Sequence, residues 1–178
     1  MTYYAPARAP APPYVSSFSS CALAYWITDP SSATNASANY AVFQVVIVPS
    51  ACVARRVWWA NGAVVAGNVS VAIYASTGTL IPGAKLVECA STAQSGTAEI
   101  QFAGITDTTL PPGLYFIALV CSDASATIFR SSLSSSADAL YVFNQAGVTV
   151  GSFPATATPV ESAVANRYLY GFATTASP

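Results

Sequence analysis

The sequence predicts an all-β protein: an antiparallel two-sheet sandwich, jelly-roll-like, with an extended Pro/Ala-rich N-terminal arm. From about Leu23 onward, short runs rich in β-branched and aromatic residues alternate with Gly, Pro, Ser and Asn. Breaks at intervals of about 8–12 residues are typical of sandwiches and barrels. No run has the 3.6-residue apolar period of an amphipathic helix. The chain of 178 residues suits one domain with a buried core. We therefore expect an arm over residues 1–20 and one sandwich domain over residues 21–178.

The N-terminal arm is predicted from its prolines, which alternate with alanines in the first fourteen residues. Proline has no N–H to donate and a fixed φ, so this stretch favours an extended polyproline-II conformation. Three tyrosines give it aromatic side chains for contact. We expect the arm to dock on a neighbouring subunit, and the alternative is an ordinary unattached terminus. The predicted subunit-contact residues are Tyr3, Tyr4, Pro6, Pro10, Pro12, Pro13 and Tyr14, with Trp26 beside the arm and Trp59 in the sandwich.

The strands are predicted from residue type and from turn signals. Tyr40–Val48 is rich in β-branched and aromatic residues and stops at Pro49. Val53–Trp59 ends at Asn61-Gly62, a strong turn signal. Leu114–Cys121 is apolar on both faces, as expected of a central strand covered on both sides. The other expected strands are 69–74, Lys85–Cys89, Glu99–Phe102, Thr127–Arg130, Ala139–Phe143, Val148–Phe153 and Arg167–Phe172.

The composition indicates a surface that is covered by other proteins. Apolar residues make up 53% of the chain and charged residues only 7%, against about 25% charged in an average domain. A monomer ordinarily depends on mixed charge to stay in solution. We therefore expect protein partners and a homo-oligomer, for which a trimer is plausible. The alternative is a monomer whose surface hydroxyls and amides keep it in solution.

Several classes of function are disfavoured by what the sequence lacks. The chain has six Lys and Arg, too few and too scattered for nucleic acid as a main partner. No apolar run reaches the ~20 residues that span a bilayer, so we expect no membrane partner. Histidine is absent, which removes the usual general base and the commonest metal ligand. Glu88 and Glu99 flank one hairpin-like loop and could form a carboxylate pair, but a pair exposed on a sheet face is the simpler interpretation. We predict no enzyme, no catalytic residue, no metal and no cofactor.

The N-terminus points to a cytoplasmic site of synthesis, unless the chain is a processed fragment, and the expected state of the cysteines follows from that compartment. The N-terminal residues lack the cationic start and apolar stretch of a signal peptide. In a reducing compartment the four cysteines should be small buried apolar residues, and a disulfide between two of them is the less favoured alternative. Asn35 and Asn68 match the glycosylation pattern, which without a secretory route we interpret as loop chemistry.

The adjacent tryptophans Trp58 and Trp59 must point to opposite faces of their strand. One should lie in the core. The other could pack on a sheet face, contact another subunit, or form a sugar platform beside Asn61.

Two motifs resemble a known family. The chain contains a glycine turn leading into an alternating strand, and later a Pro-Gly turn leading into an apolar strand. The matching residues are Gly67, Asn68, Val69, Val71, Ile73, Tyr74 and Gly78, then Leu110, Pro112, Gly113, Leu114, Tyr115, Ala118 and Leu119. Over roughly residues 40–130 this pattern resembles the β-sandwich structural proteins of tailed bacteriophages. The resemblance implies a virion component on the particle surface, made in the host cytoplasm, and it assigns no catalytic residues.

Two virion roles are open. The first is a capsid decoration or cement protein that bridges major capsid subunits, favoured by the low charge and the Pro-Ala arm. The second is a tail or tail-fibre component that binds a host-surface receptor, such as a glycan. A binding domain of a secreted or enzyme-linked protein is a third, less favoured interpretation.

Overall fold

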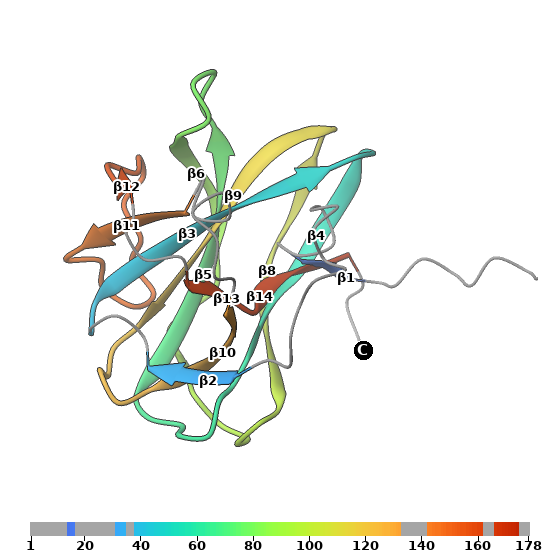
Figure 1. Ribbon diagram of the computed structural model, residues 1–178. Coiled ribbons are helices and arrows are strands. Elements are labelled where there is room, and N and C mark those ends of the chain that lie inside the picture. Colours follow the sequence, from blue (N-terminus) through green and yellow to red (C-terminus); the bar gives the residue numbers. More distant parts are fainter. Residues whose placement is uncertain (1–13, 17–30, 35–37, 133–141, 162–165, 175–178) are drawn as a thin grey trace, which may run out of the picture.

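The computed structural model describes residues 14–16, 31–34, 38–132, 142–161 and 166–174. These residues form strands and loops, with no helix among them. The strands lie in packed layers and every strand pairing is antiparallel (Figure 1). The predicted all-β, antiparallel sandwich architecture is thus confirmed.

The first layer is one sheet in the order β12-β11-β3-β9-β5-β6, and β7 also pairs with β5. Its centre is β9, which pairs with β3 on one side and with β5 on the other. The bounds are β3 (Tyr40–Val48), β5 (Asn68–Ser76), β6 (Pro82–Glu88), β7 (Thr92–Ala93), β9 (Gly113–Cys121), β11 (Val142–Ala146) and β12 (Val160–Glu161).

The second layer consists of two smaller sheets, in the orders β1-β14-β4-β8 and β13-β10-β2. Leu169 links them, because its N–H donates to Phe129 O and its carbonyl accepts from Ala60 N. The bounds are β1 (Tyr14–Ser16), β2 (Ser31–Thr34), β4 (Cys52–Ala60), β8 (Ile100–Leu110), β10 (Thr127–Ser132), β13 (Asn166–Tyr168) and β14 (Tyr170–Ala173).

The predicted arm contains one paired strand. Tyr14–Ser16 form β1 and pair with β14, Tyr14 opposite Ala173. The rest of the predicted arm, residues 1–13 and 17–20, lies outside the described residues. The point at which residues 1–13 join the sandwich is therefore the β1 edge of the four-stranded sheet.

The strands agree best with the sequence where apolar runs end at a strong breaker. β3 has the predicted bounds and stops before Pro49, which has no N–H for a ladder. β8 is much longer than the predicted strand Glu99–Phe102, because residues 103–110 continue it as an edge strand. Their threonines are β-branched, and an edge strand accepts polar side chains that face water.

Two of the expected strands near the C-terminal end differ from the structure. Residues 148–153 form a loop with a single bridge between Thr149 and Ser152. Gly147 and Gly151 there have φ of 74° and 77°, left-handed values that break an extended strand. The predicted strand 167–172 is divided at Leu169 into β13 and β14, which belong to different sheets. Of the predicted strand 139–143, residues 139–141 lie outside the described part of the chain.

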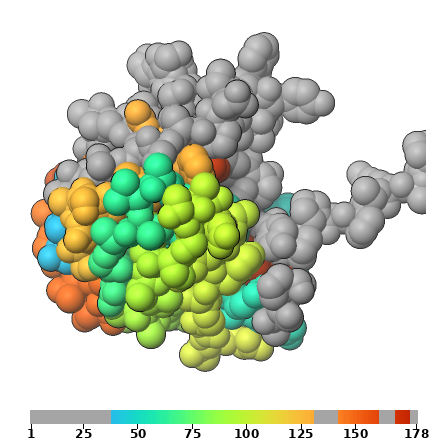
Figure 2. Space-filling model, turned by 90° about the horizontal axis from the view of Figure 1, so that it is seen from below, coloured from blue at the N-terminus to red at the C-terminus, as the bar shows by residue number. Residues whose placement is uncertain are grey.

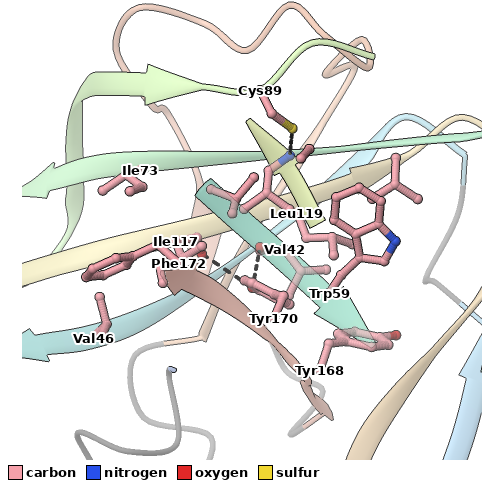
Figure 3. Packing of buried hydrophobic residues seen from close by; sticks show 14 of the residues in the cluster. Val42, Val46, Trp59, Ile73, Cys89, Ile117, Leu119, Tyr168, Tyr170 and Phe172 are labelled. Carbon is pink, nitrogen blue, oxygen red and sulfur yellow. Dashed lines mark hydrogen bonds between the residues drawn. The ribbon is translucent and has the colours of Figure 1, made fainter. Parts of the chain in front are cut away.

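The inner core fills the space between the layers. Val42, Ile73, Ile117 and Leu119 of the first layer meet Trp59, Tyr168, Tyr170 and Phe172 of the second (Figure 3). The Tyr170 hydroxyl donates to Val42 O over 2.7 Å and also lies 3.3 Å from Ile117 O. A buried hydroxyl is thus satisfied by two strands of the opposite layer, which ties the layers together.

A second apolar cluster covers the outer face of the first layer. Phe43, Tyr74 and Phe116 point away from the inner core and pack with Val148 and Phe153 from the loop after β11. We call residues 147–157 the strap. The strap is also joined to the β6 edge, since Lys85 N donates to Ala155 O and Ala157 N to Gly83 O. The central strands of the first layer are therefore buried on both faces.

Candidate functional surfaces

Most of the predicted contact residues fall outside the described part of the chain. Tyr3, Tyr4, Pro6, Pro10, Pro12, Pro13 and Trp26 are in that group. Tyr14 begins β1. Trp59 lies in the inner core with an exposed fraction of 0%. Its prediction as a subunit-contact residue is therefore corrected, because a fully buried side chain offers no surface to a partner.

The tryptophan on the other side of β4 is Trp58, as the alternation of a strand requires. Val57 and Trp59 face the inner core, so Arg56 and Trp58 face outward from the four-stranded sheet. The strand register places Trp58 between Phe102 on β8 and Gly171 on β14. The Arg56 guanidinium lies over the Phe102 ring, 4.5 Å from its centroid.

We call the outward residues Arg56, Trp58, Phe102, Gly104 and Gly171 the Trp58 face. Two of its five members are glycines, of which Gly104 is exposed and Gly171 is buried. A Cβ added at Gly104 would meet no atom within 4 Å. Trp58 itself is 8% exposed and its indole N–H has no hydrogen-bond partner. A buried donor without an acceptor costs about 1–3 kcal/mol.

A buried polar cluster closes the end of the sandwich near the loops 61–67 and 93–99. Figure 2 looks onto this end, where the two loops lie side by side. At its centre is Asn61, with an exposed fraction of 0%. Its Oδ1 accepts from Trp59 Nε1 and from Gln94 Nε2, each at 2.9 Å. Its Nδ2 donates to Gln101 Oε1 at 3.1 Å and to Ser95 O.

This cluster satisfies each polar atom of Asn61 internally. The sugar platform considered for Asn61 and a neighbouring tryptophan is therefore not formed at this place, because both Asn61 and Trp59 are buried. The sequence signal for the cluster was Asn61-Gly62 itself, which was recognised only as a turn.

The acidic residues are held apart. Glu88 accepts from Lys85 Nζ at 2.8 Å and from Phe153 N at 2.7 Å, so it fastens the strap. Glu99 precedes β8 in the opposite layer, and the strand pairing suggested for these two glutamates does not occur.

Two aspartates lie elsewhere in the described part of the chain. Asp107 forms an exposed ion pair with Arg55 at 3.3 Å. Hydrogen bonds from the Ser125 hydroxyl and N–H lower the pKa of Asp123.

No group of three or more Cys, Asp or Glu that could hold a metal ion occurs in the described ranges. Cys89 and Cys121 are buried in the inner core, as predicted, and Cys52 is half-buried beside it. Burial raises the pKa of the Cys52 and Cys89 thiols, which keeps both protonated and weakly nucleophilic. Cys21 lies outside the described residues.

Of the two glycosylation patterns, the one at Asn68 lies in a strand. Asn68 begins β5 and its side-chain amide donates to Ser91 Oγ at 2.7 Å. Ser70 is fully buried. The interpretation as loop chemistry is thus corrected for Asn68, whose amide serves to join β5 to the loop before β7, and Asn35 lies outside the described residues.

No family model, curated protein or solved structure matches this chain. Across the part of the chain that the structure describes, no helix has the length and apolarity to cross a bilayer.

Proposed function

We propose that this chain is a non-enzymatic structural protein of a bacteriophage virion, most simply a capsid decoration or cement protein that bridges major capsid subunits. Its partners would be the major capsid protein and further copies of itself, and its place the virion surface. The main support is the combination of 7% charged residues with an N-terminal arm that joins the sandwich at the edge of an apolar, aromatic sheet face.

We further propose that the sandwich is a jelly roll. If β1, β3, β4, β5, β6, β8, β9 and β14 are numbered one to eight in chain order, the second layer reads one, eight, three, six. The matching part of the first layer reads two, seven, four, five. This is the strand order of two interlocked Greek keys, an arrangement found in viral capsid and lectin domains. Such an analogy raises the expectation of a capsid role without assigning it.

The Trp58 face supports a docking role for the four-stranded sheet. Trp and Arg are enriched at the energetically dominant positions of protein interfaces. Residues 1–13 precede β1, which is two strands from β4, so the arm is attached to the sheet that carries the Trp58 face. Docking of a subunit here would cover the half-buried Phe102 ring and the exposed Gly104.

The deciding experiment is the copy number of the protein in purified particles, by quantitative mass spectrometry against the major capsid protein. We expect hundreds of copies in a fixed ratio to the shell protein. A few to a few dozen copies would indicate the tail instead. Complete absence from particles would refute a virion role of either kind.

The arm is tested by deleting residues 1–13, which leaves β1 in place. We expect the truncated protein to keep the thermal stability of the full chain but to bind stripped particles at least about 10-fold more weakly, as loss of a modest contact would cause. Equal binding by the two proteins would contradict the proposed arm.

The alternative role is a tail or tail-fibre component that binds a host-surface receptor such as a glycan. The jelly-roll order also favours this alternative, because lectin domains share it. A glycan array with the intact protein distinguishes the two, since a cement protein should bind no sugar selectively.

A further inference from the structure

Asn61-Gly62, predicted as a turn, is a chemically reactive pair, and in the structure Asn61 forms an isolated β-bridge with Ile128. In a flexible chain, the backbone nitrogen after an asparagine can attack the side-chain carboxamide. Glycine in the second position favours this reaction, because it has no Cβ to hinder the approach and has the widest backbone freedom. Asn61 is the only asparagine of this chain that is followed by glycine.

The reaction has two balanced steps. Gly62 N loses its proton and bonds to Asn61 Cγ, while the Cγ–Nδ2 bond breaks and nitrogen leaves as ammonia. Water then opens the resulting five-membered imide at either carbonyl. The product is aspartate or isoaspartate at position 61, with one NH₂ replaced by one hydroxyl, which ionises.

The folded structure holds both reacting groups. Gly62 N donates to Thr127 O at 2.9 Å, so the attacking nitrogen is engaged. The Asn61 carboxamide is held by hydrogen bonds from Gln94 and Trp59 and to Gln101. Cyclisation would break most of these bonds at once. Asn61 is also fully buried, which withholds the water and base that the reaction needs.

We propose that Asn61-Gly62 is a deamidation site that the fold keeps unreactive, so that opening of this end of the sandwich is recorded as an irreversible covalent change. The site is reactive only while loops 61–67 and 93–99 are detached. Local opening of this kind is a normal property of loop-rich ends of folded domains.

The product does not fit the place that asparagine occupied. An aspartate at position 61 offers only acceptors, whereas Asn61 Nδ2 donates to Gln101 Oε1 and Ser95 O. These two acceptor oxygens would then face the carboxylate oxygens of the aspartate in a buried cluster, and the oxygens would repel one another. A chain that has opened and reacted therefore cannot close again as before.

The test compares the intact protein in mildly alkaline buffer with the same protein in concentrated urea, followed by peptide mapping with mass spectrometry. We expect the peptide containing Asn61 to gain about 1 Da in urea. In the native protein the change should be slower by at least about 10-fold, and by about 10³-fold or more if only the globally unfolded chain reacts. Equal rates in the two conditions would overturn the proposal, as would an Asn61 that stays unmodified in urea.

A pair of variants tests the loop contacts. Gln94→Ala removes the donor to Asn61 Oδ1 and the acceptor of Ala66 N, and should raise the native rate several-fold. Gln145→Ala removes a comparable hydrogen bond, to Thr158 N on the strap side, and should leave the rate at position 61 unchanged. Equal deamidation rates at Asn61 in the two native variants would contradict protection by the loop cluster. So would rates that change only in proportion to the free energy of unfolding of each variant.

Discussion

At the scale of single residues, a few buried polar groups each require one particular hydrogen-bond partner, and so favour this arrangement of the chain over others. Asn61 and Tyr74 each place a polar atom against a backbone or side-chain partner from a distant part of the chain. Such groups cost stability when a partner is removed, because the remaining atom stays buried without a hydrogen bond.

We expect Asn61→Asp to lower the free energy of unfolding by about 3 kcal/mol, because an acceptor-only charge replaces a buried amide. Urea unfolding followed by tryptophan fluorescence measures the change. A loss below about 1 kcal/mol would mean that the cluster around Asn61 tolerates an ion.

Tyr74 should make the protein sensitive to alkali. Burial first, and the nearby charge of Glu88 second, raise the pKa of Tyr74 well above its ordinary value. A group whose pKa is raised by folding contributes stability that is present below its unfolded pKa and is lost as the pH rises through the folded pKa. The free energy of unfolding should therefore fall above about pH 10. Tyr74→Phe should make this fall shallower, and unchanged pH profiles in urea titrations would contradict the assignment.

At the scale of elements, the strap and the strand β9 determine which positions are sensitive to substitution. Phe116 and Leu114 both point to the outer face of the first layer by alternation, but only Phe116 lies in the cluster under the strap. Leu114, predicted as core, is 37% exposed. We expect Phe116→Ala to cost about 3–5 kcal/mol and Leu114→Ala below about 1.5 kcal/mol, measured by chemical unfolding. Similar losses in the two variants would show that coverage by the strap is unimportant.

The ion pair that fastens the strap can be tested against an exposed ion pair. Lys85 Nζ contacts both Glu88 and the carbonyl of Phe153, and Glu88 contacts Phe153 N. Glu88→Gln should lower stability by about 1–2 kcal/mol and speed amide exchange at Phe153. The matched control Asp107→Asn removes a charge from the exposed pair with Arg55 and should cost under about 0.5 kcal/mol. Unchanged exchange at Phe153 in Glu88→Gln would contradict the role of this carboxylate.

The sequence predicted those elements whose apolar pattern is simple. β3 and β9 were recognised because their runs are long and bounded by a breaker, Pro49 after β3 and Pro112-Gly113 before the apolar run of β9. The strap was missed because Val148, Val150 and Phe153 look like a strand, and only the left-handed glycines around them show otherwise. The sequence also could not predict which of Trp58 and Trp59 faces the inner core. The register shift between Ala54 and Arg56 reverses the alternation along β4, and it arises from pairing with β8.

At the scale of the whole molecule, low charge and the partly exposed Trp58 face suggest self-association. The chain has 13 charged side chains, six basic and seven acidic, and a net charge of −1, so long-range repulsion between copies is weak. We expect light scattering after gel filtration to give a mass that is a small multiple of the monomer, a trimer being the simplest closed cluster. Replacement of Phe102, the half-buried ring of the Trp58 face, by Ser should lower that mass. A monomer at all concentrations would contradict the expected homo-oligomer.

Strand β9 has a consequence for how this protein changes over evolutionary time. A strand in an ordinary sandwich turns every second residue to water, and those positions can drift with little penalty. In β9 the seven residues Tyr115–Cys121 are all buried, because the inner core covers one face and the strap covers the other. No position in that stretch is free to drift, so divergence should be slowest there. A search for distant relatives of this chain should therefore be anchored on β9.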